Sequence, residues 1–147
     1  MKNKVALVCG ASAGLGFAAA KSLAAEGAEL FIVSRTAERI ENAADKIAAE
    51  YSVRPRAIAA DIGTDNGIAA IKSAVSDHAI DILVSNGGGP PSGQFVEHES
   101  QAWQDAARLV LDSAISLTRL VIDSMIERKS GRLIYITSVG VLQPVDE

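Results

Sequence analysis

The chain has few of the residues that build several common kinds of site. It has one cysteine, Cys9, which excludes an internal disulfide and favours a reducing compartment. Its two histidines, His78 and His98, lack the spacing of metal ligands, so no metal site is predicted. The net charge of −4 provides no basic surface for nucleic acid or for an anionic membrane. These scarcities favour a soluble globular protein.

The sequence also lacks a long uninterrupted hydrophobic run. Its most apolar stretch, residues 109–126, contains Asp112, Arg119 and Asp123, so we predict no membrane span. The first residues enter a short strand directly, without the pattern of a secretory signal. We therefore expect a cytoplasmic protein.

Short apolar runs alternate regularly with helical patterns along the chain. Strands are predicted at residues 5–9, 30–34, 57–60, 80–85 and 133–137. Helices are predicted at residues 14–26, 36–51, 65–77 and 101–128, with Gly27 ending the first helix and Thr36 capping the second. Short strands that are apolar throughout suit a parallel sheet covered on both faces. The α/β pattern predicts one Rossmann-type doubly wound domain, residues 1–147, with five strands in the order 3-2-1-4-5 and truncated after the fifth strand.

The turn after the first strand has the pattern G-x-x-x-G-x-G, formed by Gly10, Gly14 and Gly16. Gly10 permits a tight turn, Gly14 lets the backbone approach a pyrophosphate, and Gly16 lets the helix lie close to the sheet. The helix that follows would direct its free N–H groups toward the phosphates. An ordinary glycine-rich loop is the alternative, but the strand–turn–helix context favours dinucleotide binding. The residues assigned to the same site between the glycines are Ser12, Ala13 and Leu15.

Arg35 ends the second predicted strand, where dinucleotide-binding folds select their cofactor. An acidic residue there binds the ribose hydroxyls of NAD, whereas arginine favours the 2′-phosphate of NADP. The guanidinium of Arg35 and the hydroxyl of Ser34 can hold a phosphate by charge-assisted hydrogen bonds. The alternative is a solvated arginine at the start of a helix. NADP(H) is the predicted cofactor and NAD(H) the second choice; the lack of a carboxylate argues against an S-adenosylmethionine methyltransferase.

Four segments together resemble the short-chain dehydrogenase/reductase family, over essentially the whole chain. They are the glycine turn, Asp61, the sequence Asn86-Gly87-Gly88, and the sequence Tyr135-Ile136-Thr137-Ser138. The resemblance is closest to the 3-oxoacyl-carrier-protein reductase-like members. It implies an NADP(H)-dependent oxidoreductase that transfers hydride reversibly between the nicotinamide and a small carbonyl or alcohol substrate.

The resemblance also implies roles for individual residues. Asp61 would accept a hydrogen bond from the adenine amino group, and Ile62 would border the ring. Residues 86–88 would lie against the cofactor's ribose, although the family pattern at 85–88 is Asn-Asn-Ala-Gly. Ser138 would be catalytic, because the family places there the serine that hydrogen-bonds the substrate carbonyl or hydroxyl. Without the resemblance, a loop aspartate and a serine at a strand end are more typical of turns.

Two expected parts of the family's machinery are absent from the sequence. The proton donor should be a tyrosine followed four residues later by lysine, but Tyr51 is followed by Pro55 and Tyr135 by Val139. The resemblance aligns Val110 with an asparagine that organises a proton-relay water, and valine cannot hydrogen-bond a water. We therefore expect the chain to be a catalytically incomplete fragment, inactive alone. The alternative function is a non-catalytic dinucleotide-binding or interaction module.

The predicted helix 101–128 is apolar over more than one face, and its polar residues form one narrow stripe. A helix that covers only a sheet needs a single apolar face. We therefore expect a homo-oligomer through helix 101–128, with the apolar run 133–136 leaving an open sheet edge.

Overall fold

The structure is a computed structural model that describes residues 1–89 and 91–138. Its strands are β1 (Val5–Cys9), β2 (Glu29–Ser34), β3 (Arg56–Ala59), β4 (Ile82–Ser85) and β5 (Arg132–Tyr135). Its helices are α1 (Gly14–Ala25), α2 (Ala37–Glu50), α3 (Asp65–Ala74), α4 (Ser100–Ala107) and α5 (Ser113–Glu127). Two short turns complete the description, a 3-10 turn η1 (Phe95–Glu97) and a π-helical turn η2 (Arg108–Asp112).

The five strands form one parallel sheet in the order β3-β2-β1-β4-β5, which confirms the predicted topology. β1 lies at the centre, where Leu7 is opposite Phe31 of β2 and Leu83 of β4. After β1 the chain builds the sheet outward to β2 and β3, and then returns to the other side of β1 with β4. In such sheets, ligands bind at the carboxyl ends of the strands beside this reversal. The topology therefore indicates a candidate binding site at the end of β1.

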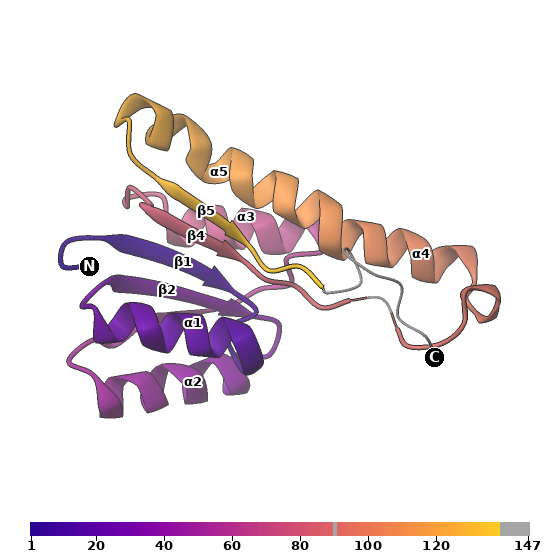
Figure 1. Cartoon of the computed structure of the whole chain (residues 1–147), viewed down its shortest axis with the longest axis horizontal. Coiled ribbons are helices and arrows are strands. Elements are labelled where there is room, and N and C mark those ends of the chain that lie inside the picture. Colours follow the sequence, from indigo (N-terminus) through magenta and orange to yellow (C-terminus); the bar gives the residue numbers. More distant parts are fainter. Residues whose placement is uncertain (90, 139–147) are drawn as a thin grey trace.

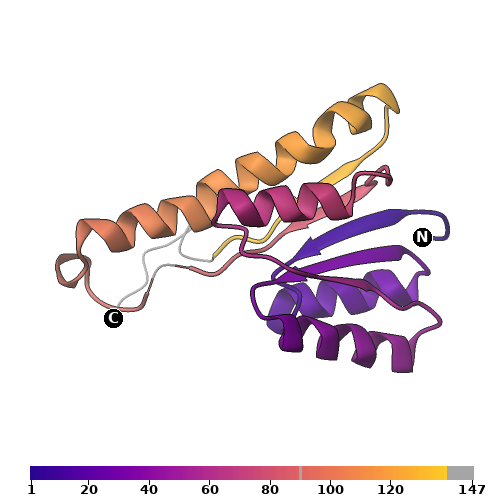
Figure 2. The same ribbon diagram turned by 180° about the vertical axis from the view of Figure 1, so that it is seen from behind.

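Helices cover both faces of the sheet, α1 and α2 on one side and α3 and α5 on the other (Figures 1 and 2). Alternate residues of each strand face the two layers, so β1 is apolar throughout, and the buried residues 30–33 of β2 and 82–84 of β4 are apolar on both faces. One half of the core contains Val8, Ile32 and Ile47, and the other contains Leu7, Phe31, Ile71 and Leu117. This two-sided burial explains why the short strands lack polar alternation.

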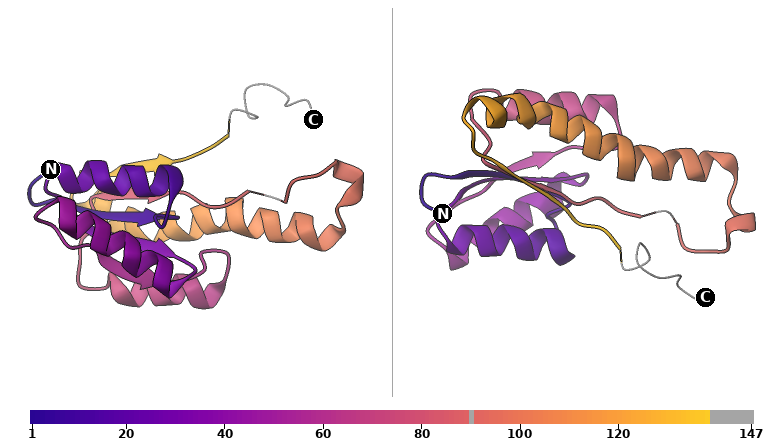
Figure 3. Two further views of the ribbon diagram at one scale, coloured as in Figure 1. Left: turned by 90° about the horizontal axis from the view of Figure 1, so that it is seen from below. Right: turned by 45° about the horizontal axis from the view of Figure 1, so that its top comes forward.

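The predicted helix 101–128 is confirmed in its extent, because α4, η2 and α5 follow one another without a gap and share one line (Figure 3). It is not α-helical throughout, since η2 is a π-helical turn. α5 packs on the sheet, whereas α4 has no buried residues and extends past the carboxyl ends of the strands (Figure 3). The hydroxyl of Ser113 donates to the carbonyl oxygen of Leu109 at 2.5 Å, which satisfies an acceptor that the π turn leaves without its usual partner.

The fourth strand begins at Ile82, two residues later than predicted, because Asp81 has another role. Its buried carboxylate accepts hydrogen bonds from the N–H of Val5 at 3.0 Å, from Lys4 Nζ at 3.1 Å and from Arg128 Nη1 at 2.8 Å. Burial by itself would raise the pKa of Asp81, but these three donors together hold the pKa below its ordinary value of 3.8. One carboxylate thus joins the start of β1, the start of β4 and the end of α5.

We expect the substitution Asp81→Asn to lower the free energy of unfolding by about 2 kcal/mol at neutral pH, because it removes charge-assisted hydrogen bonds to a buried acceptor. A lowered pKa in the folded state gives stability that is present above the unfolded value and is lost as the pH falls through the folded value. The difference between the two proteins should therefore shrink below about pH 4. Urea unfolding at several pH values tests this. Asp77→Asn, at an exposed site, is the control, and equal acid dependence in Asp81→Asn and wild type would contradict the interpretation.

Two kinds of feature are missing from residues 1–89 and 91–138. No helix there has the length and apolar character needed to cross a bilayer. No group of three or more His, Cys, Asp or Glu side chains in the same part of the chain is arranged to hold a metal ion.

Candidate functional site

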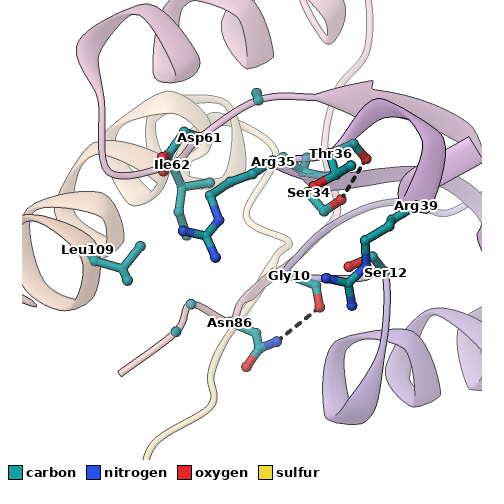
Figure 4. A pocket seen from close by; sticks show the side chains of 14 residues that line it. Gly10, Ser12, Ser34, Arg35, Thr36, Arg39, Asp61, Ile62, Asn86 and Leu109 are labelled. Carbon is teal, nitrogen blue, oxygen red and sulfur yellow. Dashed lines mark hydrogen bonds between the residues drawn. The ribbon is translucent and has the colours of Figure 1, made fainter. Parts of the chain in front are cut away.

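A pocket of about 200 Å³ opens at the carboxyl ends of the strands, beside the end of β1 (Figure 4). It is bounded by the turn after β1, by the end of β2 and the start of α2, and by the segments that follow β3 and β4. The residues that line it are Gly10, Ser12, Val33, Ser34, Arg35, Thr36, Arg39, Ala60, Asp61, Ile62, Asn86, Gly87, Gly88 and Leu109. Of the predicted site residues, Ala13, Gly14, Leu15, Gly16 and Ser138 are not in this lining.

The glycine turn has the geometry expected of a phosphate loop. Gly10 and Gly14 have φ angles of +62° and +58°, a conformation that side chains disfavour. A Cβ atom at Gly10 would lie 2.6 Å from the carbonyl oxygen of Asn86, whereas one at Gly14 would meet nothing within 4 Å. Gly10 is therefore required by its contact with Asn86, the residue after β4, and the open space at Gly14 leaves room for a ligand to approach the backbone.

Gly16 serves packing instead. A Cβ atom there would contact the carbonyl oxygen of Gly10 and lie 2.8 Å from Asn86 Nδ2. The first turn of α1 therefore lies directly on the end of β1. Asn86 links the same elements, because its Nδ2 donates to the carbonyl oxygen of Gly10 at 3.3 Å. The ends of β1 and β4 and the start of α1 thus form one unit.

The N-terminus of α1 is suited to an anion. Its N-cap residue, Ala13, has no side chain that could accept a hydrogen bond, and its first turn contains no acidic residue. By contrast, the N-cap Thr64 of α3 accepts from the N–H of Gly67 at 3.0 Å. The first N–H groups of α1 therefore remain available for a ligand at the positive end of the helix dipole.

Two arginines lie on the opposite wall of the pocket. Arg35 follows β2, and Arg39 lies in the first turn of α2, beside Ser12 in Figure 4. Neither guanidinium forms an ion pair with any residue of the described ranges 1–89 and 91–138. Thr36 is the N-cap of α2, as predicted, although its side chain makes no capping hydrogen bond. The wall therefore presents two unneutralised positive charges.

Arg39 was missed in the sequence analysis. The available signal was its position four residues after Arg35, in the first turn of the helix that follows the second strand. Residues at that point of a doubly wound fold face the same end of the sheet as the glycine turn. The predicted site named only the arginine at the strand end.

Asp61 forms a turn and also lines the pocket. Its Oδ1 accepts from the N–H of Gly63 at 2.9 Å, and its carbonyl oxygen accepts from Thr64 Oγ1 at 3.0 Å. This local bonding is the typical behaviour of a loop aspartate. The carboxylate has a second oxygen, Oδ2, and Ile62 beside it is an apolar part of the same wall. The turn interpretation and the binding interpretation are therefore compatible.

Leu109 is a second lining residue that the sequence analysis missed. It belongs to the π-helical turn, and its backbone lies close to the segment after β4. A Cβ atom at Gly87 would lie 3.2 Å from the carbonyl oxygen of Leu109, and one at Gly88 would lie 3.3 Å from Leu109 Cδ2. Small residues at 87 and 88 thus allow the helix to close this side of the pocket.

Four residues that were considered for a chemical role do not line this pocket. Ser138 is the last described residue after β5, outside the pocket lining. The hydroxyl of Tyr135 is 2.5 Å from Thr118 Oγ1 of α5, so this tyrosine faces that helix. Val110 is half-exposed and does not line the pocket. Cys9 is buried at the end of β1, and burial raises the pKa of its thiol to about 12, so it stays protonated.

Comparisons with known proteins agree with this arrangement. The family model described as short chain dehydrogenase matches residues 4–147. The uncharacterized oxidoreductase YvaG of Bacillus subtilis is 32% identical over all of this chain and 55% of its own length. A fatty acyl-CoA reductase of Acinetobacter baylyi is 36% identical over 97% of this chain and 49% of its own length.

Solved structures give the same result. L-sorbose reductase from Gluconobacter frateurii, complexed with NADPH and L-sorbose, superposes with a TM-score of 0.92 at 31% identity, over 99% of this chain and 56% of that one. The chain thus spans about half the length of the relatives it matches. Its sheet order, glycine turn and similarity along nearly its whole length show that it belongs to the short chain dehydrogenase family.

Proposed function

We propose that this chain is the cofactor-binding part of an NADP(H)-dependent oxidoreductase that interconverts a small carbonyl compound and its alcohol. One observation carries the choice of NADP(H): the wall of the pocket after β2 presents Arg35 and Arg39, and its lining there contains no carboxylate. A 2′-phosphate placed between the two guanidinium groups would gain charge-assisted hydrogen bonds. The ribose hydroxyls of NAD(H) would gain none of these, so NAD(H) is the weaker alternative.

The residues present fit the other parts of the dinucleotide. The free N–H groups at the start of α1, with the loop from Gly10 to Gly16, would hold the diphosphate. Asp61 and Ile62 would border the adenine, and residues 86–88 would lie against the ribose of the nicotinamide half. When bound, the nicotinamide would supply or accept the hydride. The cofactor in the structure of L-sorbose reductase is NADPH, which supports this choice.

Ser138 would hydrogen-bond the oxygen of the substrate's carbonyl or alcohol. The tyrosine-x-x-x-lysine pair that would transfer the proton does not occur within residues 1–147. General acid catalysis is worth about 10²–10⁴-fold in rate. The chain by itself therefore binds the cofactor but does not turn over, and the activity proposed belongs to the whole protein. We place that protein in the cytoplasm.

The first test is binding and turnover by the 147-residue chain. We expect NADPH to bind, NADH to bind at least about tenfold more weakly because it lacks the phosphate, and no reduction of aldehydes or ketones above background. Isothermal titration gives the two affinities, and loss of NADPH absorbance gives turnover. Titration with adenosine, which lacks the phosphate groups and the nicotinamide, is the control for binding that does not depend on those groups. Equal affinities for NADPH and NADH would contradict the NADP(H) proposal, and turnover would contradict the proposed inactivity.

A second candidate is a non-catalytic dinucleotide-binding or interaction module. The exposed apolar side chains of η2 and α5 favour a protein contact, because patches of this kind are usually interfaces. We propose that the contact is with another copy of the chain, through residues 101–128. Oligomerisation and cofactor binding are independent properties, so the chain can have both.

A further inference from the structure

The imidazole of His78 joins three elements at the amino end of the sheet. His78 lies in the turn between α3 and β4, and its ring packs edge-on against the ring of Phe31 in β2, with the centroids 4.8 Å apart. Its Nε2 atom is 2.8 Å from Nη1 of Arg56, the first residue of β3, and 3.5 Å from Oε1 of Glu29, the first residue of β2. Arg56 Nη2 also forms an ion pair with Glu29 Oε1 at 3.0 Å. We call Glu29, Arg56 and His78 the edge cluster.

The contact with Arg56 fixes the protonation of the ring. A guanidinium has only N–H donors and keeps its positive charge, so Nε2 must accept the hydrogen bond from Arg56. His78 is therefore neutral in this arrangement, with its proton on Nδ1. The Nδ1 atom is buried and has no hydrogen-bond partner within residues 1–89 and 91–138. The neutral ring thus accepts one hydrogen bond and leaves its own donor unsatisfied, which is unfavourable.

A second proton on the ring would change the charge balance of the edge cluster. With neutral His78, the charges of Glu29 and Arg56 cancel. A proton on Nε2 would remove the acceptor, place two positive groups 2.8 Å apart and leave one carboxylate to serve both. In the described part of the chain, the charged groups in contact with the ring are these two, since the neighbouring Asp77 is hydrogen-bonded to Ser76. Protonation therefore favours separation of His78 from Arg56.

The strand that this contact secures, β3, has little other burial. It is the outer strand of the sheet, has four residues and pairs only with β2. Ile58 is the one residue of the strand that is buried. Arg56 fixes its start, because the guanidinium also lies over the ring of Phe31, 5.1 Å from the centroid. Segments with few buried contacts open locally at a lower free energy than the centre of a sheet.

We propose that the edge cluster is a pH-sensitive clamp on β3. With neutral His78, Arg56 is held at once by His78, by Glu29 and by the face of Phe31, so the start of β3 is fixed to β2. Protonation of His78 releases Arg56 from the ring and lets β3 separate from β2 more often. Imidazole side chains change charge between about pH 5 and 8, so the clamp responds to mild acidification.

Hydrogen exchange of the β3 amides tests the clamp. In the wild type we expect their protection factors, corrected for intrinsic exchange, to fall about tenfold or more from about pH 8 to about pH 5. His78→Gln keeps an acceptor for Arg56 but no group that gains a proton in this range, so its β3 protection should change less than about twofold. His98→Gln, which removes the other histidine, is the control and should behave as the wild type does. The central strand β1 is the internal reference, and its protection should fall much less than that of β3.

A second measurement needs no substitution and decides the proposal even where a variant fails to fold. The nitrogen NMR chemical shifts of the His78 ring in the wild type should show a proton on Nδ1 and none on Nε2 at about pH 8. A proton on Nε2 at that pH, constant β3 protection in the wild type, or an equal loss in His78→Gln would each overturn the clamp. An equal fall in β1 would overturn it too, because the whole domain would then be opening. None of these measurements involves NADPH, so they are independent of the proposed function.

Discussion

Replacing Arg35 and Arg39 together by glutamine is expected to weaken NADPH binding about hundredfold or more and to change NADH binding by less than about threefold. Hydrogen bonds to charged groups contribute about 1.5–3 kcal/mol each, and about 1.4 kcal/mol corresponds to a tenfold change in affinity. Both arginines line the pocket without an ion-pair partner in the described part of the chain, so their replacement breaks no ion pair there. Isothermal titration of both dinucleotides gives the two ratios.

The matched control is Arg54→Gln. Arg54 lies beyond the other end of α2 and pairs with Asp45 at 2.6 Å, so the substitution removes a guanidinium without touching the pocket. The single variant Arg39→Gln shows whether this residue contributes on its own, with an expected loss of about tenfold for NADPH. Equal losses for NADPH and NADH in the double variant would mean that the arginines do not contact a 2′-phosphate.

Gly16→Val is expected to abolish NADPH binding and to lower the free energy of unfolding by about 2–3 kcal/mol. A Cβ atom at this position would contact the backbone of Gly10, and backbone cannot move aside as a flexible side chain can. The start of α1 would have to move away from the sheet, and overpacking of this kind costs about 1–3 kcal/mol. The same displacement would take the free N–H groups of α1 away from the diphosphate. Chemical denaturation and titration measure the two effects.

Gly89→Ala is the control, because a Cβ atom there would meet nothing within 4 Å and the residue has no positive φ angle. Gly14→Ala provides a useful contrast. Its Cβ would also have open space, so its cost in stability should be about 1 kcal/mol, from the positive φ angle alone. Normal NADPH affinity in folded Gly16→Val would show that the position of α1 is not needed for binding.

The fold followed from the sequence because its local and long-range signals agree. Apolar runs such as residues 5–9 suit a strand covered on both faces, and the glycine turn after that run fixes where α1 begins. Strand order then follows from right-handed crossovers and the position of that turn. Asp81 could not be assigned in this way, since its three donors come from distant parts of the chain.

Residues of the candidate site could be predicted where a sequence motif indicates a required backbone conformation. They were missed where contacts between distant parts of the chain bring a residue to the pocket. Gly10 and Arg35 could be predicted because each directly follows a predicted strand. Leu109 lines the pocket from a π turn within the helix, and the sequence around it is compatible with a regular α-helix. To predict Arg39 as a lining residue, one would need to know which side of α2 faces the turn after β1. The roles of individual residues toward the cofactor stay predictions.

A crystal structure of the chain with NADPH is the most direct test of whether it binds this dinucleotide in the pocket beside β1. We expect the diphosphate over the first turn of α1, beside Gly14, and the 2′-phosphate between Arg35 and Arg39. A diphosphate bound anywhere else on the protein, or a 2′-phosphate directed away from both arginines, would contradict the proposed function.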